Sequence, residues 1–159
     1  MEDNTTEMTT RRFINADRAA VFAGWTDPEI LRIWWGPQGG THESILVEPW
    51  TGGKHEIVMG MPSSGAVFRI AGIVEECLAP TVFAVRYQTQ TMAGEPLLEG
   101  TFRVKFSEEN GGTMQELYNR TTHLVPVEPD RRAGTAAGWN QSIDRLAAYL
   151  EVRADTIGK

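Results

Sequence analysis

A two-residue alternation of apolar and polar side chains runs through most of the chain after residue 43 and limits the folds open to it. The alternation is clearest in 98–106, where Leu98, Phe102 and Phe106 share one side and Arg103 lies on the other. Five further segments are predicted to be strands: 43–48, 54–60, 67–77, 82–92 and 113–122. Alternation of this kind predicts antiparallel strands that bury one face and expose the other.

Two short helices are predicted between a first strand at 9–15 and the alternating region. Asp17 is the predicted N-cap of the first helix, because its side chain can accept hydrogen bonds from the free N–H groups of the first turn. Thr26 and Glu29 have the spacing of a capping box for the second helix. The helix pair therefore occupies residues 17–35.

One long helix is predicted after the strands, from near Pro129 to about Val152. Its apolar residues recur at helical spacing: Trp139, Ile143, Leu146 and Leu150. A curved antiparallel sheet has one face to bury, and this helix has the apolar length to cover it. We therefore expect an α+β domain at 9–153, with six to seven strands wrapped around the helix and a cavity between them. Residues 1–8 are expected to be a flexible N-terminus and 154–159 a tail.

Charge and composition exclude several classes of protein. The 159 residues carry 15 Lys and Arg against 21 Asp and Glu, a net charge of −6, without the basic cluster that nucleic acid requires. No apolar run is long enough for a transmembrane helix, and the first ten residues do not resemble a signal peptide. The single Cys77 suits a reducing compartment. We therefore expect a cytoplasmic protein that neither binds nucleic acid nor inserts into membranes.

Several blocks of this sequence resemble a known family. The blocks are Trp25-Thr26-Asp27-Pro28-Glu29, Trp34-Trp35-Gly36-Pro37, Gly52-Gly53, and Gly138-Trp139 with Gln141, Asp144 and Leu146. Together they are similar to the activator of heat-shock-protein-90 ATPase homologue-like family, in the Bet v 1/START-like (SRPBCC) superfamily, over about residues 9–152. The chain departs from the family pattern before the double glycine, at residues 48–51, and at Gln115.

The resemblance implies a helix-grip fold, in which a curved sheet holds the long C-terminal helix. Relatives in the superfamily include co-chaperone domains, polyketide cyclases and lipid carriers, so the resemblance indicates the fold more narrowly than the function. The co-chaperone that names the family has a further N-terminal domain, for which this chain has no room. A chaperone partner is therefore not expected.

The predicted cavity defines the candidate ligand-binding residues. They are Trp34, Trp35, His55, Ile57, Met59, Phe68, Tyr87, Phe102, Gln115, Leu117, Trp139 and Ile143. Aromatic side chains dominate because their faces can stack on a flat apolar ligand. Neighbouring helical residues point about 100° apart, so Trp34 and Trp35 are not expected to face the cavity equally.

The sequence does not decide which side of strand 113–122 faces inward, because either Leu117 or Tyr118 could be the buried residue. If Leu117 faces inward, Gln115 and Asn119 bring two amides into the cavity. A buried amide without a partner costs about 1–3 kcal/mol, so these two groups would need a ligand, water or each other.

Other polar residues are predicted to lie away from the cavity. Glu76 is expected to bond to backbone near the turn at Pro80, His42 and His123 to be solvated, and Arg145 to lie on the wet face of the long helix. The histidines lack the short spacing of a zinc site, and there is no phosphate loop or nucleophile motif. We therefore expect neither a metal nor a cofactor.

Three functions are compatible with these patterns. A binding protein for a small hydrophobic or aromatic molecule is favoured, because a cavity is predicted and no catalytic motif is found. A cyclase- or hydratase-like enzyme would use His55, Tyr87 or Tyr118 as acid–base residues. A protein-interaction role like that of the co-chaperone would need an exposed apolar patch. A homodimer is compatible with each function.

Overall fold

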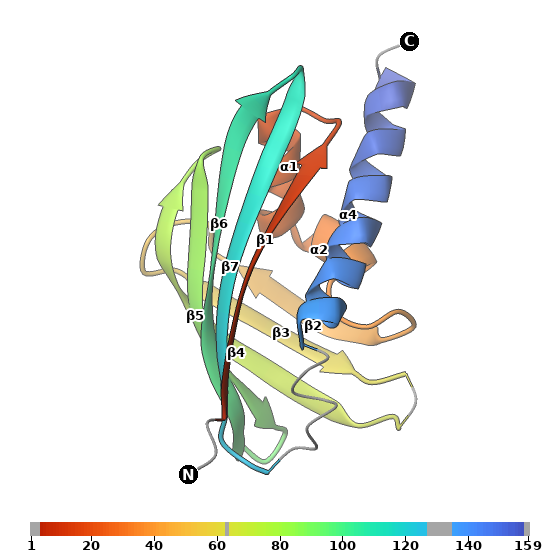
Figure 1. Cartoon of the computed structure of the whole chain (residues 1–159). Coiled ribbons are helices and arrows are strands. Elements are labelled where there is room, and N and C mark those ends of the chain that lie inside the picture. The colour runs from red at the N-terminus through yellow and green to blue at the C-terminus, as the bar shows by residue number, and fades with distance from the viewer. Residues whose placement is uncertain (1–3, 63, 127–134, 158–159) are drawn as a thin grey trace.

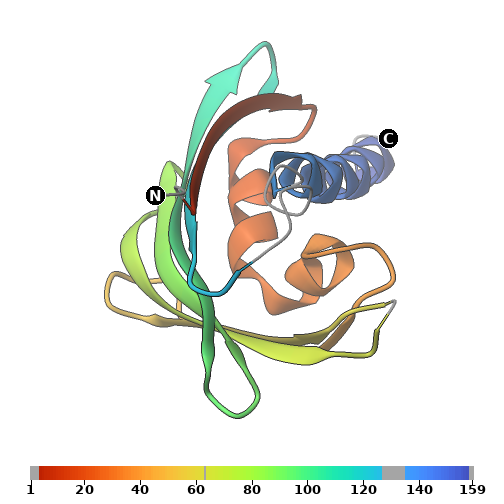
Figure 2. The same cartoon turned by 60° about the horizontal axis from the view of Figure 1, so that its bottom comes forward.

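A strongly curved antiparallel sheet encloses the helices of the molecule on its concave side (Figure 2). The computed structural model describes residues 4–62, 64–126 and 135–157. Within these residues the elements follow in the order β1 (Thr5–Ile14), α1 (Arg18–Thr26), α2 (Pro28–Trp34), β2 (Thr41–Val47), β3 (Lys54–Gly60), β4 (Val67–Leu78), β5 (Val82–Thr91), β6 (Pro96–Glu109), β7 (Gly112–His123) and α4 (Thr135–Ile157). The predicted order of elements is confirmed: a strand, a helix pair, six strands and a long helix (Figure 1).

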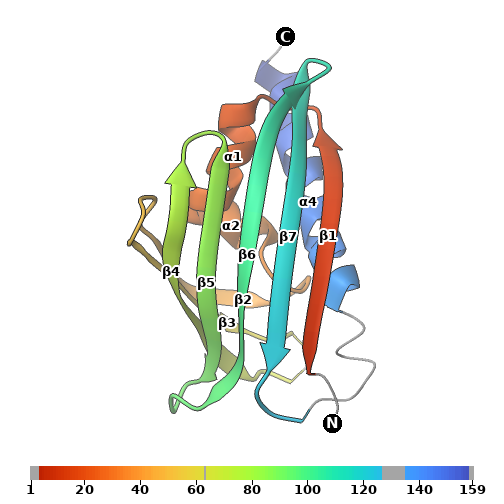
Figure 3. The same ribbon diagram turned by 60° about the vertical axis from the view of Figure 1, so that its left-hand side comes forward.

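The seven strands are ordered β1-β7-β6-β5-β4-β3-β2, and every neighbouring pair is antiparallel. The first strand of the chain therefore pairs with the last, and β1 and β2 form the two edges. Figure 3 shows the outer face of the sheet in front and the helices behind it. Because the outer face is open to solvent and the inner face is covered, the two-residue alternation seen in the sequence has a direct structural cause.

Both ends of the domain extend further than the sequence predicted. The first strand begins at Thr5 rather than at residue 9, because Thr5 to Met8 continue the ladder opposite Asn119 to Thr122 of β7. The segment assigned to a flexible terminus is thus partly strand. Helix α4 continues to Ile157, beyond the expected end near Val152. The predicted start near Pro129 lies outside the described residues.

The starts of the two short helices show one confirmed and one wrong prediction. Asp17 caps α1, since its carboxylate accepts a hydrogen bond of 2.8 Å from the backbone N–H of Ala20. The cap of α2 is Asp27 rather than Thr26: its carboxylate accepts a 2.9 Å bond from the N–H of Glu29. Thr26 instead donates its hydroxyl to the carbonyl of Phe22, one turn back in α1. The capping-box spacing misplaced the cap by one residue.

The core is centred on Trp25, whose indole is fully buried. Its ring lies 4.8 Å from that of Trp34, 5.5 Å from Phe102 and 6.1 Å from Trp139, measured between centroids. These partners belong to α2, β6 and α4. Trp25 also donates its indole N–H to the side-chain carbonyl of Gln115 on β7, at 2.8 Å. One side chain of α1 thus contacts the second helix, the sheet and the long helix.

This hydrogen bond resolves the facing of β7, which the sequence left open. Gln115, Leu117 and Asn119 are buried on the inner side, and Tyr118 is 37% exposed on the outer side. The amide at position 115 is kept inside because it supplies the acceptor that a buried indole N–H requires. The side of β7 that carries the two amides, Gln115 and Asn119, therefore faces inward.

Replacing Trp25 with Phe tests the central position of this residue. The change leaves the carbonyl of Gln115 without its donor and shortens the buried ring, so we expect the free energy of unfolding to fall by about 2–3 kcal/mol. Trp50 is 56% exposed, and the same substitution there provides the matched control, with an expected change below about 0.5 kcal/mol. Urea unfolding followed by far-ultraviolet circular dichroism measures both. Equal losses for the two variants would contradict the assignment.

Candidate functional site

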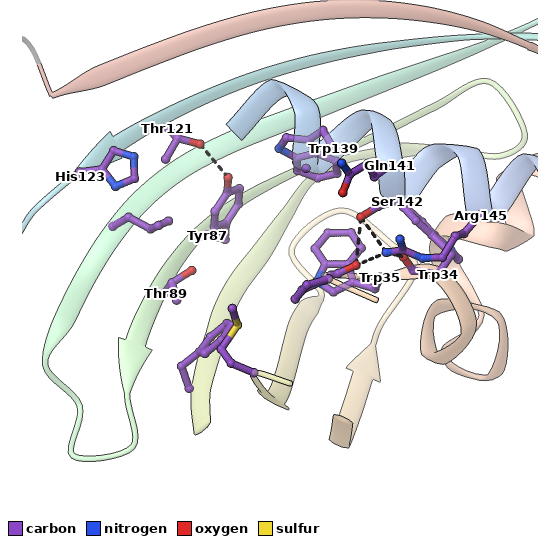
Figure 4. Close-up of a pocket in the computed structure, with 16 residues that line it drawn as sticks. Trp34, Trp35, Tyr87, Thr89, Thr121, His123, Trp139, Gln141, Ser142 and Arg145 are labelled. Carbon is purple, nitrogen blue, oxygen red and sulfur yellow. Dashed lines mark hydrogen bonds between the residues drawn. The ribbon is translucent and has the colours of Figure 1, made fainter. Parts of the chain in front are cut away.

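A pocket of about 410 Å³ opens between the helices and the inner face of the sheet. It lies between the end of α2, the first half of α4 and strands β4 to β7 (Figure 4). The described residues that line it are Trp34, Trp35, Gly36, Pro37, Met61, Phe68, Tyr87, Thr89, Leu98, Thr121, His123, Gly138, Trp139, Gln141, Ser142 and Arg145. The volume is in the range, about 300–1,000 Å³, that small-molecule sites occupy.

Two tryptophans form an aromatic wall of the pocket. The rings of Trp35 and Trp139 lie 5.5 Å apart between centroids and are nearly perpendicular, at 86°. Trp35 directly follows α2 and has an extended backbone (φ −71°, ψ 132°), so its ring leaves the direction of the helical side chains. For this reason both Trp34 and Trp35 reach the pocket, although the helical geometry predicted unequal facing.

Trp35 is held by hydrogen bonds at both its backbone N–H and its backbone carbonyl. Its N–H donates to the carbonyl of Leu31 at 2.9 Å, and its carbonyl is 2.8 Å from Nε2 of His42. His42, predicted to be solvated, is therefore half-buried, and burial is the main reason that its pKa is lowered, although the bond to Trp35 opposes this shift. The neutral imidazole fixes the aromatic wall rather than facing solvent.

A hydroxyl-bearing wall faces the tryptophans from β5 and β7. The ring of Tyr87 crosses β6 over Gly100, where a Cβ would lie only 3.0 Å from the Tyr87 hydroxyl. The Tyr87 hydroxyl accepts a 3.0 Å bond from the amide of Asn119 and lies 3.3 Å from the hydroxyl of Thr121. The Thr121 hydroxyl in turn donates to the side-chain carbonyl of Asn119 at 3.1 Å. The three side chains form a closed hydrogen-bonded ring on the wall of the pocket.

The end of the pocket nearest α2 is polar and is held by Arg145. Its Nη2 donates to the carbonyl oxygens of Trp34 and Gly36 and to the Ser142 hydroxyl. Ser142 also donates to the carbonyl of Gly36, at 3.1 Å. Arg145 was assigned to the wet face of the helix, but it is half-buried against the end of α2 and lines the pocket.

The structure brings five of the predicted cavity residues to the pocket and leaves seven in the core. The five are Trp34, Trp35, Phe68, Tyr87 and Trp139. The seven buried residues away from the pocket are His55, Ile57, Met59, Phe102, Gln115, Leu117 and Ile143. The pocket is displaced toward the ends of β5 and β7, because the tryptophan and phenylalanine rings fill the space deeper in the fold.

His55 shows this displacement most clearly. It is fully buried, and its ring lies 5.7 Å from those of Trp35 and Phe102. Neither ring nitrogen has a hydrogen-bond partner on another of the described residues. Burial lowers the pKa of His55 to about 4, so the imidazole is neutral at physiological pH. His55 is a core residue and does not line the pocket.

Several lining residues were not predicted, although the sequence contains a pattern that marks them. Gly138, Gln141, Ser142 and Arg145 follow the i, i+3, i+4, i+7 spacing of one helix face. His123, predicted to be solvated, is 9% exposed and lines the pocket. Its position follows from the two-residue period of β7 once the inward facing of Leu117 is known. Thr89 and Thr121 follow from the same period on their strands.

Outside the pocket, Glu76 corrects another prediction. Its carboxylate accepts from Arg103 of β6, with Nη2 at 2.9 Å, rather than bonding to backbone near Pro80. Cys77 donates to the carbonyl of Pro49 at 3.2 Å, and burial raises the pKa of its thiol. Glu76 lies on the outer side of the sheet, whereas Cys77 packs against the hydrophobic core.

The described residues contain no group of three or more His, Cys, Asp or Glu side chains arranged to hold a metal ion. None of the helices in the described part of the chain combines the length and the apolar composition required to span a membrane.

The sequence profile of the family described as Activator of Hsp90 ATPase homolog 1-like protein matches residues 15–151. No protein with a curated description matches the chain.

Solved structures with similar folds come from several bacteria. A protein from Chromobacterium violaceum has a TM-score of 0.77 at 19% identity, over 93% of this chain and 97% of that one. The AHSA1 protein from Silicibacter pomeroyi has a TM-score of 0.75 at 19% identity, over 93% and 99%. A protein from Arthrobacter aurescens has a TM-score of 0.73 at 24% identity, over 91% of this chain and 85% of that one. With the observed sheet and helices, these likenesses confirm the Bet v 1-like helix-grip fold.

The buried imidazole predicts a pH dependence of stability. In the unfolded chain His55 titrates near its ordinary pKa of 6.5, whereas in the folded protein its pKa is about 4. Between these values the unfolded state binds the proton and the folded state does not, so stability falls as the pH drops below 6.5. From pH 7 to pH 5 the expected contribution is a loss of about 2 kcal/mol.

The variant His55→Phe keeps an aromatic ring and removes the titration. We expect it to lose about 2 kcal/mol less than the wild type between pH 7 and pH 5, as measured by urea unfolding at each pH. A variant that is destabilised by acid as much as the wild type would show that His55 is not buried as a neutral group.

Proposed function

Because this chain belongs to the Activator of Hsp90 ATPase homolog 1-like family, we propose that it is a binding protein for a small aromatic or apolar molecule. The site is the pocket between α2, α4 and the ends of β4 to β7. The helix-grip fold is that of ligand-binding domains in general, and the identity of the ligand is a matter for the residues of this pocket. The activity in the family description is that of the protein for which the family is named.

The observation that carries the proposal is the aromatic wall, whose two rings are held in position by contacts within the protein. Trp35 is oriented by hydrogen bonds at both its N–H and its carbonyl, and the ring of Trp139 is stacked 6.1 Å from buried Trp25. Neither ring needs to move to form one side of the pocket. A wall that is already in position keeps its ordering cost out of the binding free energy, and it offers flat faces to a flat ligand.

The opposite wall supplies hydrogen bonds to such a ligand. Burial is the main cause that raises the pKa of Tyr87, so its hydroxyl keeps its proton at physiological pH. The bond from this hydroxyl to Thr121 is long, at 3.3 Å, and can be exchanged for a bond to a ligand oxygen. A few placed polar groups within an apolar lining are typical of specific small-molecule sites.

The acid–base residues proposed for an enzyme are not gathered in this pocket. His55 lies in the core, and Tyr118 is on the outer face of the sheet. Tyr87 alone of the three lines the pocket. A single protonated tyrosine supports binding better than a general acid–base reaction, which requires a group of matched pKa near the operating pH.

Gly138 allows the pocket to be closed without disturbing its walls. This residue is exposed on α4 and lines the pocket, and a Cβ built there has no heavy atom within 4 Å. Gly138→Trp would place a large ring in the open space, whereas Gly138→Ala adds one methyl group. Both changes replace a helical glycine, so the alanine variant is the matched control and should be slightly more stable than the wild type, by up to about 1 kcal/mol.

The test is a thermal-shift and native mass spectrometry screen against aromatic acids, flavonoids and fatty acids. At about 100 times the Kd, a ligand adds about 2.7 kcal/mol of stability, or a rise of about 5–10 °C in Tm for a domain of this size. We expect such shifts with the wild type and Gly138→Ala, and none with Gly138→Trp. Binding that persists in the tryptophan variant, or a panel without a single binder, would refute the proposal.

A further inference from the structure

The pocket contains one side chain with a fixed charge. Among the described residues that line it there is no Asp or Glu, and Arg145 contributes a positive guanidinium. The protein as a whole carries a net charge of −6. A positive group in the lining of the pocket of an acidic protein marks the place where a negative group of a ligand would be stabilised.

Arg145 is not neutralised by the carboxylates of the described residues. Its guanidinium forms no ion pair with any of them, whereas five other arginines do. The nearest carboxylate in the sequence, Asp144, pairs instead with Arg12 of β1. Within the described part of the chain, no carboxylate therefore competes with a bound molecule for the charge of Arg145.

The guanidinium is also oriented in advance. All the hydrogen bonds that it donates to described residues leave from Nη2, toward the carbonyls of Trp34 and Gly36 and the Ser142 hydroxyl. These bonds fix the plane of the group at the end of α2 and leave the N–H groups of Nε and Nη1 without an acceptor among the described residues. The N–H groups of Nε and Nη1 point in different directions, and each can donate one charge-assisted hydrogen bond to a carboxylate oxygen.

The fixed cation stands beside the aromatic wall. Arg145 donates to the carbonyl of Trp34, and the next residue, Trp35, faces Trp139 across 5.5 Å (Figure 4). A molecule whose ring lies against Trp35 or Trp139 would bring a substituent on that ring toward the guanidinium. The apolar surface beside the half-buried guanidinium also strengthens the attraction between this cation and an anion, since less water screens the two charges.

From this arrangement we propose that the ligand is an aromatic carboxylate, whose acid group pairs with Arg145 while its ring lies on the tryptophan wall. The inference rests on the proposed function, because it names the class of molecule that the same pocket takes. Arg145 has two roles in this account. Through Nη2 it caps the end of α2, and through Nε or Nη1 it donates a hydrogen bond to the carboxylate.

The experiment compares acids with amides of the same shape. Naphthoic acid is paired with naphthamide and cinnamic acid with cinnamamide, and each Kd for the wild type is measured by isothermal titration calorimetry at neutral pH. A hydrogen bond to a charged group contributes about 1.5–3 kcal/mol, so we expect each acid to bind at least about tenfold more tightly than its amide. This comparison needs no variant and does not depend on how a substitution folds.

Three variants then locate the preference. Arg145→Gln should reduce the ratio of acid to amide affinity to about one, and Arg145→Lys should retain part of it, because a charge is kept without the planar fork. Arg69→Gln removes the same charge from the exposed outer side of β4 and should leave the ratio unchanged. Urea unfolding of each variant records the separate loss of the α2 cap, which lowers stability but cannot by itself change a ratio of affinities.

Each result decides between the two proposals. Amides that bind as tightly as acids would overturn the carboxylate inference and leave the binding function standing. An acid preference that survives in Arg145→Gln would overturn the assignment to Arg145. If neither acids nor amides bind, and the wider panel is also without a binder, the proposed function fails together with the inference.

Discussion

The hydrogen bond between the Trp25 indole and the Gln115 amide is the interaction on which the rest of this structure depends. It joins α1 to the middle of β7, at the inner face of the sheet. Around it the rings of Trp34, Phe102 and Trp139 pack from three other elements. A buried indole requires an acceptor, and the strand provides one only if its amide-bearing side faces inward. The orientation of β7, and with it the positions of Thr121 and His123, follows from this one requirement.

The position of the pocket is a consequence of the same packing. The rings around Trp25 fill the space between helix and sheet up to Trp35, and His55 is enclosed behind them. The space left over lies toward the ends of β5 and β7, where the inward side chains are Tyr87, Thr89, Thr121 and His123. An apolar core and a partly polar pocket are therefore neighbouring parts of one inner surface. The boundary between them is the aromatic wall.

The sequence predicted the fold well because the fold rests on periodicity, which a single chain displays. Strand β6 alternates from Leu98 to Phe106, and α4 repeats its apolar residues from Trp139 to Leu150. Periodicity does not predict how deeply an inward side chain lies in the fold. His55 and Tyr87 both alternate inward, yet one is enclosed by rings and the other reaches open space, and this depends on where distant tryptophans lie. Arg145 was assigned to the solvent side since an isolated helix gives no sign that carbonyls of α2 approach it.

We propose that an aromatic wall and a fixed guanidinium together select an aromatic carboxylate. The most direct measurement is a crystal structure of the protein grown with naphthoic acid. We expect the naphthalene ring against Trp35 and Trp139, with a carboxylate oxygen within hydrogen-bond distance of Nε or Nη1 of Arg145. A ligand seated elsewhere, or one in this pocket with its carboxylate turned away from Arg145, would contradict it.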